Sequence, residues 1–178
     1  MGSKITRLSE DKFDEYSELT YLSRKEIIRA YDKFKSCDPI EFSNNLDVRF
    51  AREKIMMLPE LRVNPFAKRI CDVFSSEKDG KISFEDFLDM MSCFCERASR
   101  DVKVDYAFRI FDLNDDDYIS PEDMKLIISK LISPHELPEE HLQCIIGNIL
   151  IESDMDNDGQ LSFAEFQHLI SKSPDFFK

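Results

Sequence analysis

The sequence predicts an all-α protein of two lobes, each a pair of helix–loop–helix units, with a short helix before the first lobe. Four helix–loop–helix stretches follow one another at roughly equal intervals, which is typical of an internal repeat. Two predicted helix starts, at Ser23 and Ser162, carry a Ser-x-x-Glu capping box. The predicted helices also carry apolar residues at three- and four-residue spacing, as helices do when they pack against one another.

The helix pattern divides the chain into four parts. The apolar flank of one helix–loop–helix unit needs a second unit to cover it, so consecutive units are expected to pair. We therefore expect an N-terminal extension over residues 1–22, a first lobe over 23–100, a second lobe over 101–171 and a C-terminal tail over 172–178.

The predicted helices of the first half have well-marked starts. Residues 9–16 predict a short helix with Phe13 and Tyr16 on one side. A helix after Ser23 carries a core face of Ile27, Ile28, Tyr31 and Phe34, a helix returns over residues 52–58, and Asn64-Pro65 marks the next start because proline suits the first helical position. Residues 37–50 hold no series of acidic residues at the first, third, fifth and twelfth positions of a metal-binding loop, so we expect no metal binding there.

The stretch 154–165 fits the pattern D-x-[DN]-x-[DN]-G-x5-E at every constrained position and looks like an EF-hand calcium loop. A hard divalent cation needs about six to eight oxygens at roughly 2.3–2.6 Å, which such a ladder supplies. Gly159 stands at the sharp bend, where a positive φ costs glycine nothing. The expected ligands are the carboxylates of Asp154, Asp156 and Asp158, the Gln160 carbonyl and both oxygens of Glu165.

A second acidic ladder, over residues 112–123, departs from that pattern twice. Asp117 takes the glycine position, and the loop ends in Asp123, one methylene shorter than glutamate. Binding through a single oxygen lowers the coordination number toward six, which favours Mg²⁺ relative to Ca²⁺. We expect both ions as cofactors. The expected ligands here are Asp112, Asn114, Asp116, the Tyr118 carbonyl and Asp123.

The loop over residues 75–86 keeps the glycine and the apolar residue of the pattern, Gly80 and Ile82, but not its full set of oxygen ligands. Ser75 replaces the first aspartate, Lys78 and Lys81 add positive charge, and Asp86 replaces the final glutamate. We expect a structural role, in which Ile82 pairs with the partner loop by a short β-bridge.

Charge and composition favour a binding protein over an enzyme. The net charge is −12, and residues 101–178 carry 17 acidic against 6 basic residues, which argues against nucleic acid and for cations or basic targets. The five cysteines show no CxxC spacing and fit reduced thiols. No P-loop, GxSxG or HExxH motif is present, and His135, His141 and His168 lack a catalytic constellation.

The chain begins with a lipidation motif. Residues 1–6 satisfy M-G-x-x-x-[ST], so Gly2 is a candidate for N-myristoylation, with an ordinary start of the chain as the alternative. One myristoyl chain gives only marginal, reversible membrane binding. No apolar run approaches the length of a membrane span. We expect a cytoplasmic protein, peripheral at the plasma membrane.

Several longer segments stand out: PELRVNPF (59–66), Arg69-Ile70, FEDFLDM (84–90), YAFRIFD (106–112) and SPDF (173–176). Together they resemble the calcium- and integrin-binding protein family. The resemblance covers nearly the whole chain. It implies two silent N-terminal EF-hands, two metal-binding C-terminal ones and Gly2 myristoylation. Members of the family continue past the last segment with an apolar tail, whereas this sequence stops at Lys178; either the sequence is shortened or this member lacks the tail, and the resemblance does not carry tail-mediated autoinhibition over to it.

The family resemblance also implies partners: integrin cytoplasmic tails or, for some members, transmembrane channel-like proteins. We expect an adaptor that presents an apolar groove of the second lobe to a helical segment of such a membrane protein. A calcium buffer without a target and a regulatory subunit of a phosphatase-like enzyme are the alternatives. The candidate groove residues, chosen by spacing, are Phe108, Met124, Ile127, Ile128, Leu131, Ile145, Ile149, Phe163, Phe166 and Ile170.

Overall fold

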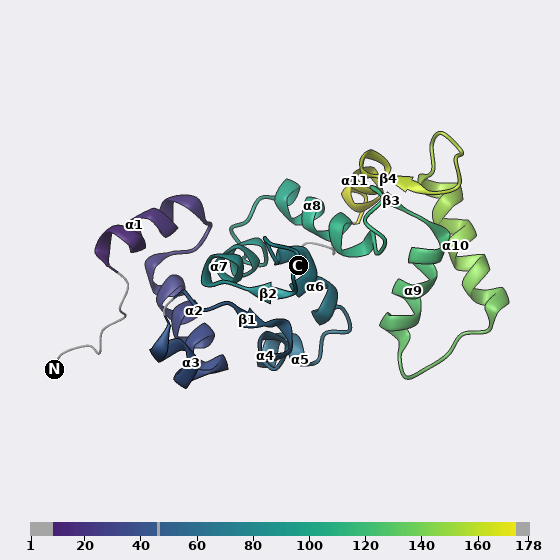
Figure 1. The fold of residues 1–178 in the computed structure, drawn as a ribbon. Helices are drawn as coiled ribbons and strands as arrows, with labels where there is room; N and C mark the ends of the chain where they lie inside the picture. Colours follow the sequence, from purple (N-terminus) through teal and green to yellow (C-terminus); the bar gives the residue numbers. More distant parts are fainter. Residues whose placement is uncertain (1–8, 46, 174–178) are drawn as a thin grey trace. The chain divides into compact units, whose positions relative to one another are not determined.

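The computed structural model describes residues 9–45 and 47–173, and residues 1–8, 46 and 174–178 lie outside the described part (Figure 1). The candidate Gly2 is among the latter. Helices dominate the described residues, and the strands are two-residue segments, so the predicted all-α fold is confirmed. None of the described helices is long and apolar enough to cross a membrane.

The chain divides into two compact units, Met1–Ser99 and Arg100–Lys178. The second unit therefore begins one residue before the expected start of the second lobe. The elements of the first unit, in chain order, are α1 (Glu10–Leu19), α2 (Arg24–Cys37), α3 (Pro39–Asn44), β1 (Phe50–Ala51), α4 (Arg52–Met56), α5 (Pro59–Arg62), α6 (Ala67–Phe74), β2 (Lys81–Ile82) and α7 (Phe84–Cys93). Those of the second are α8 (Arg100–Phe111), β3 (Tyr118–Ile119), α9 (Pro121–Ile132), α10 (Glu139–Ser153), β4 (Leu161–Ser162) and α11 (Phe163–Ser171).

Each unit contains one short antiparallel pair that joins its two loops (Figure 1). In the first unit Phe50 of β1 lies opposite Ile82 of β2. In the second unit Ile119 of β3 lies opposite Leu161 of β4. The predicted bridge at Ile82 is confirmed. All four side chains are at most 2% exposed, so each bridge is also part of its lobe's core.

The helix that follows each of three loops begins with a capping box. Ser83 caps α7, Ser120 caps α9 and Ser162 caps α11, and in each box the third residue of the helix returns a carboxylate to the serine N–H. A capping box satisfies two helix N–H groups that would otherwise lack a partner. Because that carboxylate is also the twelfth loop residue, loop closure and helix start depend on the same side chain.

Aromatic rings fill the core of the first unit. Phe34 of α2 is fully buried, and its ring centroid lies 4.7 Å from that of Phe50 and 5.6 Å from that of Phe87. The helix expected over residues 9–16 runs instead over α1, and its Tyr16 packs edge-on against Phe84. The N-terminal helix is therefore part of the first unit's core.

Several details of the first unit differ from the expectation. The helix expected over residues 52–58 ends at Met56 as α4, and the short helix α5 follows it. The helix α6 begins at Ala67 rather than at Pro65, because the Asn64 side chain accepts the Phe66 N–H (2.8 Å) and holds residues 64–66 in a turn. Residues 37–50 contain the unpredicted helix α3, which Asp38 caps by accepting the N–H groups of Ile40 and Glu41.

Candidate metal centre

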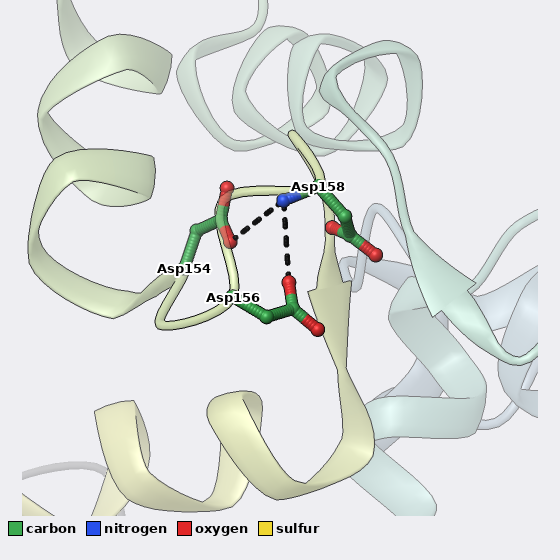
Figure 2. A group of neighbouring side chains, drawn as sticks. All are labelled: Asp154, Asp156 and Asp158. Carbon is green, nitrogen blue, oxygen red and sulfur yellow. Dashed lines mark hydrogen bonds between the residues drawn. The ribbon is translucent and has the colours of Figure 1, made fainter.

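The loop after α10 gathers three carboxylates. Oxygens of Asp154, Asp156 and Asp158 all lie within 4.8 Å of one another (Figure 2). The Asp158 backbone N–H donates to Asp154 Oδ1 and to Asp156 Oδ1, each at 3.2 Å, and the Gly159 N–H donates to Asp154 Oδ2 at 2.9 Å. The loop backbone itself therefore draws the carboxylates of the ladder toward one another.

Glu165, the twelfth loop residue, closes this loop from the first turn of α11. Its side chain is buried, and Oε1 accepts the Met155 N–H at 2.7 Å. Oε2 accepts both the N–H (2.9 Å) and the hydroxyl (2.7 Å) of Ser162. The Ser162 hydroxyl bond is the main reason that the pKa of the Glu165 carboxyl is lowered. A carboxylate held ionised at this place is suited to bind a cation.

Desolvation and neighbouring charges perturb the Asp156 carboxyl. Desolvation raises the pKa of the Asp156 carboxyl, and the charges of Asp158, Glu165 and Asp154 add to this, although the Asp158 N–H offsets part of it. A raised carboxyl pKa records a cost of keeping the group charged. A bound cation would remove that cost.

The loop over residues 112–123 repeats the arrangement. The N–H groups of Asp116 and Asp117 donate to the two oxygens of Asp112, at 3.2 and 3.0 Å. Asp123 closes the loop by accepting the N–H groups of Leu113 (3.3 Å) and Ser120 (3.0 Å). Burial is the largest cause of the raised pKa of the Asp112 carboxyl. The two loops therefore share one hydrogen-bond scheme.

The backbone bends at the same two places in both loops. The fourth and sixth residues have positive φ: 58° at Asp115 and 68° at Asp117 in one loop, 60° at Asn157 and 87° at Gly159 in the other. Non-glycine residues rarely adopt this region, and aspartate and asparagine are among the few that tolerate it. Asp117 therefore takes the positive-φ position that Gly159 takes in loop 154–165.

The loops are coupled through their bridge and the core beneath it. Ile119 and Leu161 belong to the buried cluster of the second unit, with Val104, Phe108, Met124, Ile146, Phe166 and Ile170. A displacement of one loop therefore acts on the other through packed side chains.

The donor set fits a hard divalent cation. Carboxylate, amide and backbone carbonyl oxygens suit Ca²⁺ and Mg²⁺, whereas softer metals prefer sulfur and imidazole. Asn114 Nδ2 donates to Asp116 Oδ2 at 2.7 Å, so the amide lies next to the Asp116 carboxylate. The residues that would hold an ion are Asp112, Asn114, Asp116, Tyr118 and Asp123 in one loop and Asp154, Asp156, Asp158, Gln160 and Glu165 in the other.

The candidate groove residues separate into two groups. The structure places Phe108, Met124, Phe166 and Ile170 within the core cluster, with Ile127 also buried and Ile128 and Ile149 packed against the cluster. Leu131, Ile145 and Phe163 are 61%, 38% and 39% exposed. Helical spacing does not tell which of these residues the neighbouring helices cover.

Sequence reasoning missed an apolar cavity in the first unit. It has a volume of about 270 Å³ and lies among α5, α6 and α7. Helical spacing favours the core for Phe87, Met91 and Phe94, whereas Phe94 is 55% exposed in the structure. The adjacent methionines were the available signal, because flexible thioether side chains are common at adaptable binding surfaces. The lining is Leu58, Glu60, Leu61, Asn64, Ile70, Phe87, Met90, Met91 and Phe94.

Paired helix–loop–helix units with bridged loops and the twelve-residue oxygen ladder define an EF-hand protein of the calcium-binding class. A family model described as an EF-hand domain pair matches residues 101–171. Proteins named calcium and integrin-binding family member 2 are similar over nearly the whole chain. That of Drosophila melanogaster is 40% identical and that of Homo sapiens 37%, and each alignment covers 99% of this chain and 96% of the relative. The chain belongs to the calcium and integrin-binding family, and neither comparison points to an enzyme.

Proposed function

We propose that this protein is a Ca²⁺- and Mg²⁺-dependent adaptor for a helical cytoplasmic segment of a membrane protein. The main support is the hydrogen-bond scheme common to the loops 112–123 and 154–165, in which the twelfth residue serves both the loop and the following helix. A change in the order of either loop should therefore also change the order of the first turn of the helix that follows it, α9 or α11. A bound ion would supply the positive charge that the clustered carboxylates lack.

The surface next to these loops supports a target rather than simple buffering. Phe163 begins α11 directly after the capping residue Ser162, is 39% exposed, and packs edge-on against Phe108 with ring centroids 5.4 Å apart. Leu131 and Ile145 expose further apolar surface on α9 and α10. Exposed apolar side chains beside a metal loop favour an adaptor over a calcium buffer or a subunit of a phosphatase-like enzyme.

We propose the partner from the surface chemistry of the second unit and from the names of the similar proteins. An apolar surface on a strongly acidic lobe fits an amphipathic helix with basic flanks. Relatives are named as integrin-binding, so an integrin cytoplasmic tail is the first candidate, and a cytoplasmic helix of a transmembrane channel-like protein is the second. N-myristoylation at Gly2 would add a marginal, reversible contact with the plasma membrane, where such segments lie.

The cavity of the first unit is a second candidate for the same target. Its lining is mostly apolar, and it includes the exposed Phe94 and the half-buried Met91. A target helix could insert a large apolar side chain there without rearrangement of the unit, whereas most candidate residues of the second unit are packed in its core.

Peptide binding by the full chain tests the proposal. A fluorescent integrin-tail peptide should bind with Ca²⁺ or Mg²⁺ and lose affinity with chelator. Ile145→Asp should weaken binding at least ~10-fold if Ile145 is an anchor, since buried anchors dominate interface energy. Ile151→Asp, on the same helix and 86% exposed, is the matched control, and Phe94→Asp tests the cavity.

Hydrogen exchange completes the test. The amides after Ser120 and Ser162 should lose protection with chelator in step with peptide affinity. Equal protection and equal affinity in both conditions would instead define a scaffold that works without metal. If neither the integrin peptide nor a channel-helix peptide binds in any condition, the adaptor proposal fails and a buffer remains.

A further inference from the structure

The loop over residues 75–86 is folded like a metal loop although its ladder is broken. Its fourth and sixth residues, Lys78 and Gly80, have φ of 54° and 74°, as the corresponding residues of the two acidic loops do. Asp79 at its fifth position accepts the Lys81 N–H at 2.9 Å, the bond that Asp116 and Asp158 make in theirs. Within the loop, the Ser75 hydroxyl donates to the Lys81 carbonyl at 2.8 Å, and a side chain from outside the loop binds its carboxylates.

A guanidinium occupies this loop. Arg49 donates from Nη1 and Nη2 to the two oxygens of Asp79, each at 2.9 Å, and from Nη1 to Glu77 Oε2 at 2.6 Å. Nη2 also donates to the Lys81 carbonyl at 3.3 Å. Glu77, Asp79 and Lys81 are the third, fifth and seventh loop residues, the places that supply a side chain, a side chain and a carbonyl to an ion in a metal-binding loop.

The position of Arg49 is fixed by the fold. It directly precedes β1, whose Phe50 pairs with Ile82 of β2, and both of those side chains are fully buried. The Arg49 side chain is 20% exposed, against 65% for Glu77 and 39% for Asp79. The bidentate pair with Asp79 is the strong, planar arrangement that arginine makes and lysine cannot.

We propose that the Arg49 guanidinium is the permanent cation of loop 75–86. It takes the place of a divalent ion, so the first unit is held together without metal and excludes metal from this loop. Only the second unit then responds to cations. This inference does not depend on the identity of the target.

Replacement of Arg49 in the full chain should expose a latent cation site. In wild-type protein, hydrogen-exchange protection of amides 75–86 should be the same with chelator and with millimolar Ca²⁺. In Arg49→Gln, protection should fall about tenfold with chelator, because charge-assisted hydrogen bonds are lost, and should recover in millimolar Ca²⁺. Arg49→Gln combined with Asp79→Asn should lose that recovery.

Arg52→Gln is the matched control. Arg52 is also half-buried and begins α4, but it pairs with Asp72 and Glu53 rather than with the loop carboxylates. Any protection lost in this variant should not return with Ca²⁺. Arg49→Lys, which keeps the charge, should stay protected in chelator better than Arg49→Gln. The proposal is overturned if Arg49→Gln keeps full protection in chelator, or if protection is lost and Ca²⁺ does not restore it.

Discussion

Glu165 accepts the backbone N–H of Met155 at 2.7 Å, so the last residue of loop 154–165 is tied to its second. The corresponding bond in loop 112–123 runs from the Leu113 N–H to Asp123 and is 3.3 Å long. The shorter aspartate side chain reaches less far across its loop. The loop that ends in glutamate is therefore the more firmly closed of the two.

Glu165→Gln should remove metal from one loop and leave the other filled. Glutamine keeps the shape of Glu165, but its single oxygen can accept from either Met155 or Ser162 and not from both, and it removes the charge that the ion needs. We expect Ca²⁺ affinity at loop 154–165 to fall by more than ~100-fold, since even indirect ligand partners account for about 10–100-fold. Calorimetry should count two sites in the wild-type protein and one in the variant.

Glu152→Gln provides the control for this charge change. Glu152 is exposed near the end of α10, two residues before the loop. Its replacement should leave two sites of nearly unchanged affinity. A Glu165→Gln protein that still fills both sites, or a wild-type protein that fills three, contradicts the assignment.

Asp123→Glu should raise the Ca²⁺ preference of loop 112–123. The extra methylene allows both carboxylate oxygens to reach an ion, and Ca²⁺ accepts the higher coordination number that Mg²⁺ rejects. Competition between Mg²⁺ and Ca²⁺ in calorimetry measures the change, with Glu122→Asp, an exposed neighbour, as control. If the ratio of the two affinities stays the same, side-chain length does not set selectivity here.

Much of the second unit could be predicted from the sequence because its loops are local. A twelve-residue ladder and a capping box are read from neighbouring positions, and the bridge between Ile119 and Leu161 follows once two such loops pair. The resemblance to the calcium- and integrin-binding family from PELRVNPF and SPDF also holds.

The first unit was harder because its chemistry is not local. Arg49 lies 28 to 32 residues before the loop atoms that it binds, and only the pairing of β1 with β2 brings them together. The sequence of loop 75–86, with its two lysines, therefore indicated only a loop that had lost its metal ligands. The cavity beside Phe94 was missed for the same reason, because helical spacing does not tell which apolar face remains uncovered.

Leu161→Ala should weaken both loops together. Leu161 is 2% exposed and lies opposite Ile119 in the bridge. Loss of a buried leucine should lower the free energy of unfolding of the second unit by ~2–5 kcal/mol. Because the bridge couples the loops, Ca²⁺ affinity should fall at both sites. Leu126→Ala, on an exposed position of α9, should change stability by less than ~0.5 kcal/mol.

Thermal unfolding with chelator and calorimetry with Ca²⁺ measure the two effects of Leu161→Ala. If only loop 154–165 loses affinity, the loops bind independently and the bridge is structural alone. Equal losses at both sites would support coupling through the bridge.

Asp117→Gly should relieve strain at the bend of loop 112–123. Asp117 has φ of 68°, where an ordinary residue pays roughly 1–2 kcal/mol and glycine nothing. The substitution also removes a carboxylate, so Asp117→Asn, which removes the same charge but keeps the side chain, is the reference. Relative to Asp117→Asn, the glycine variant should be more stable in chelator by up to ~1 kcal/mol, because asparagine tolerates this region only in part. Thermal unfolding of the two variants measures this difference. A glycine variant no more stable than the asparagine one would contradict a cost of the bend at residue 117, because both variants keep the N–H that donates to Asp112.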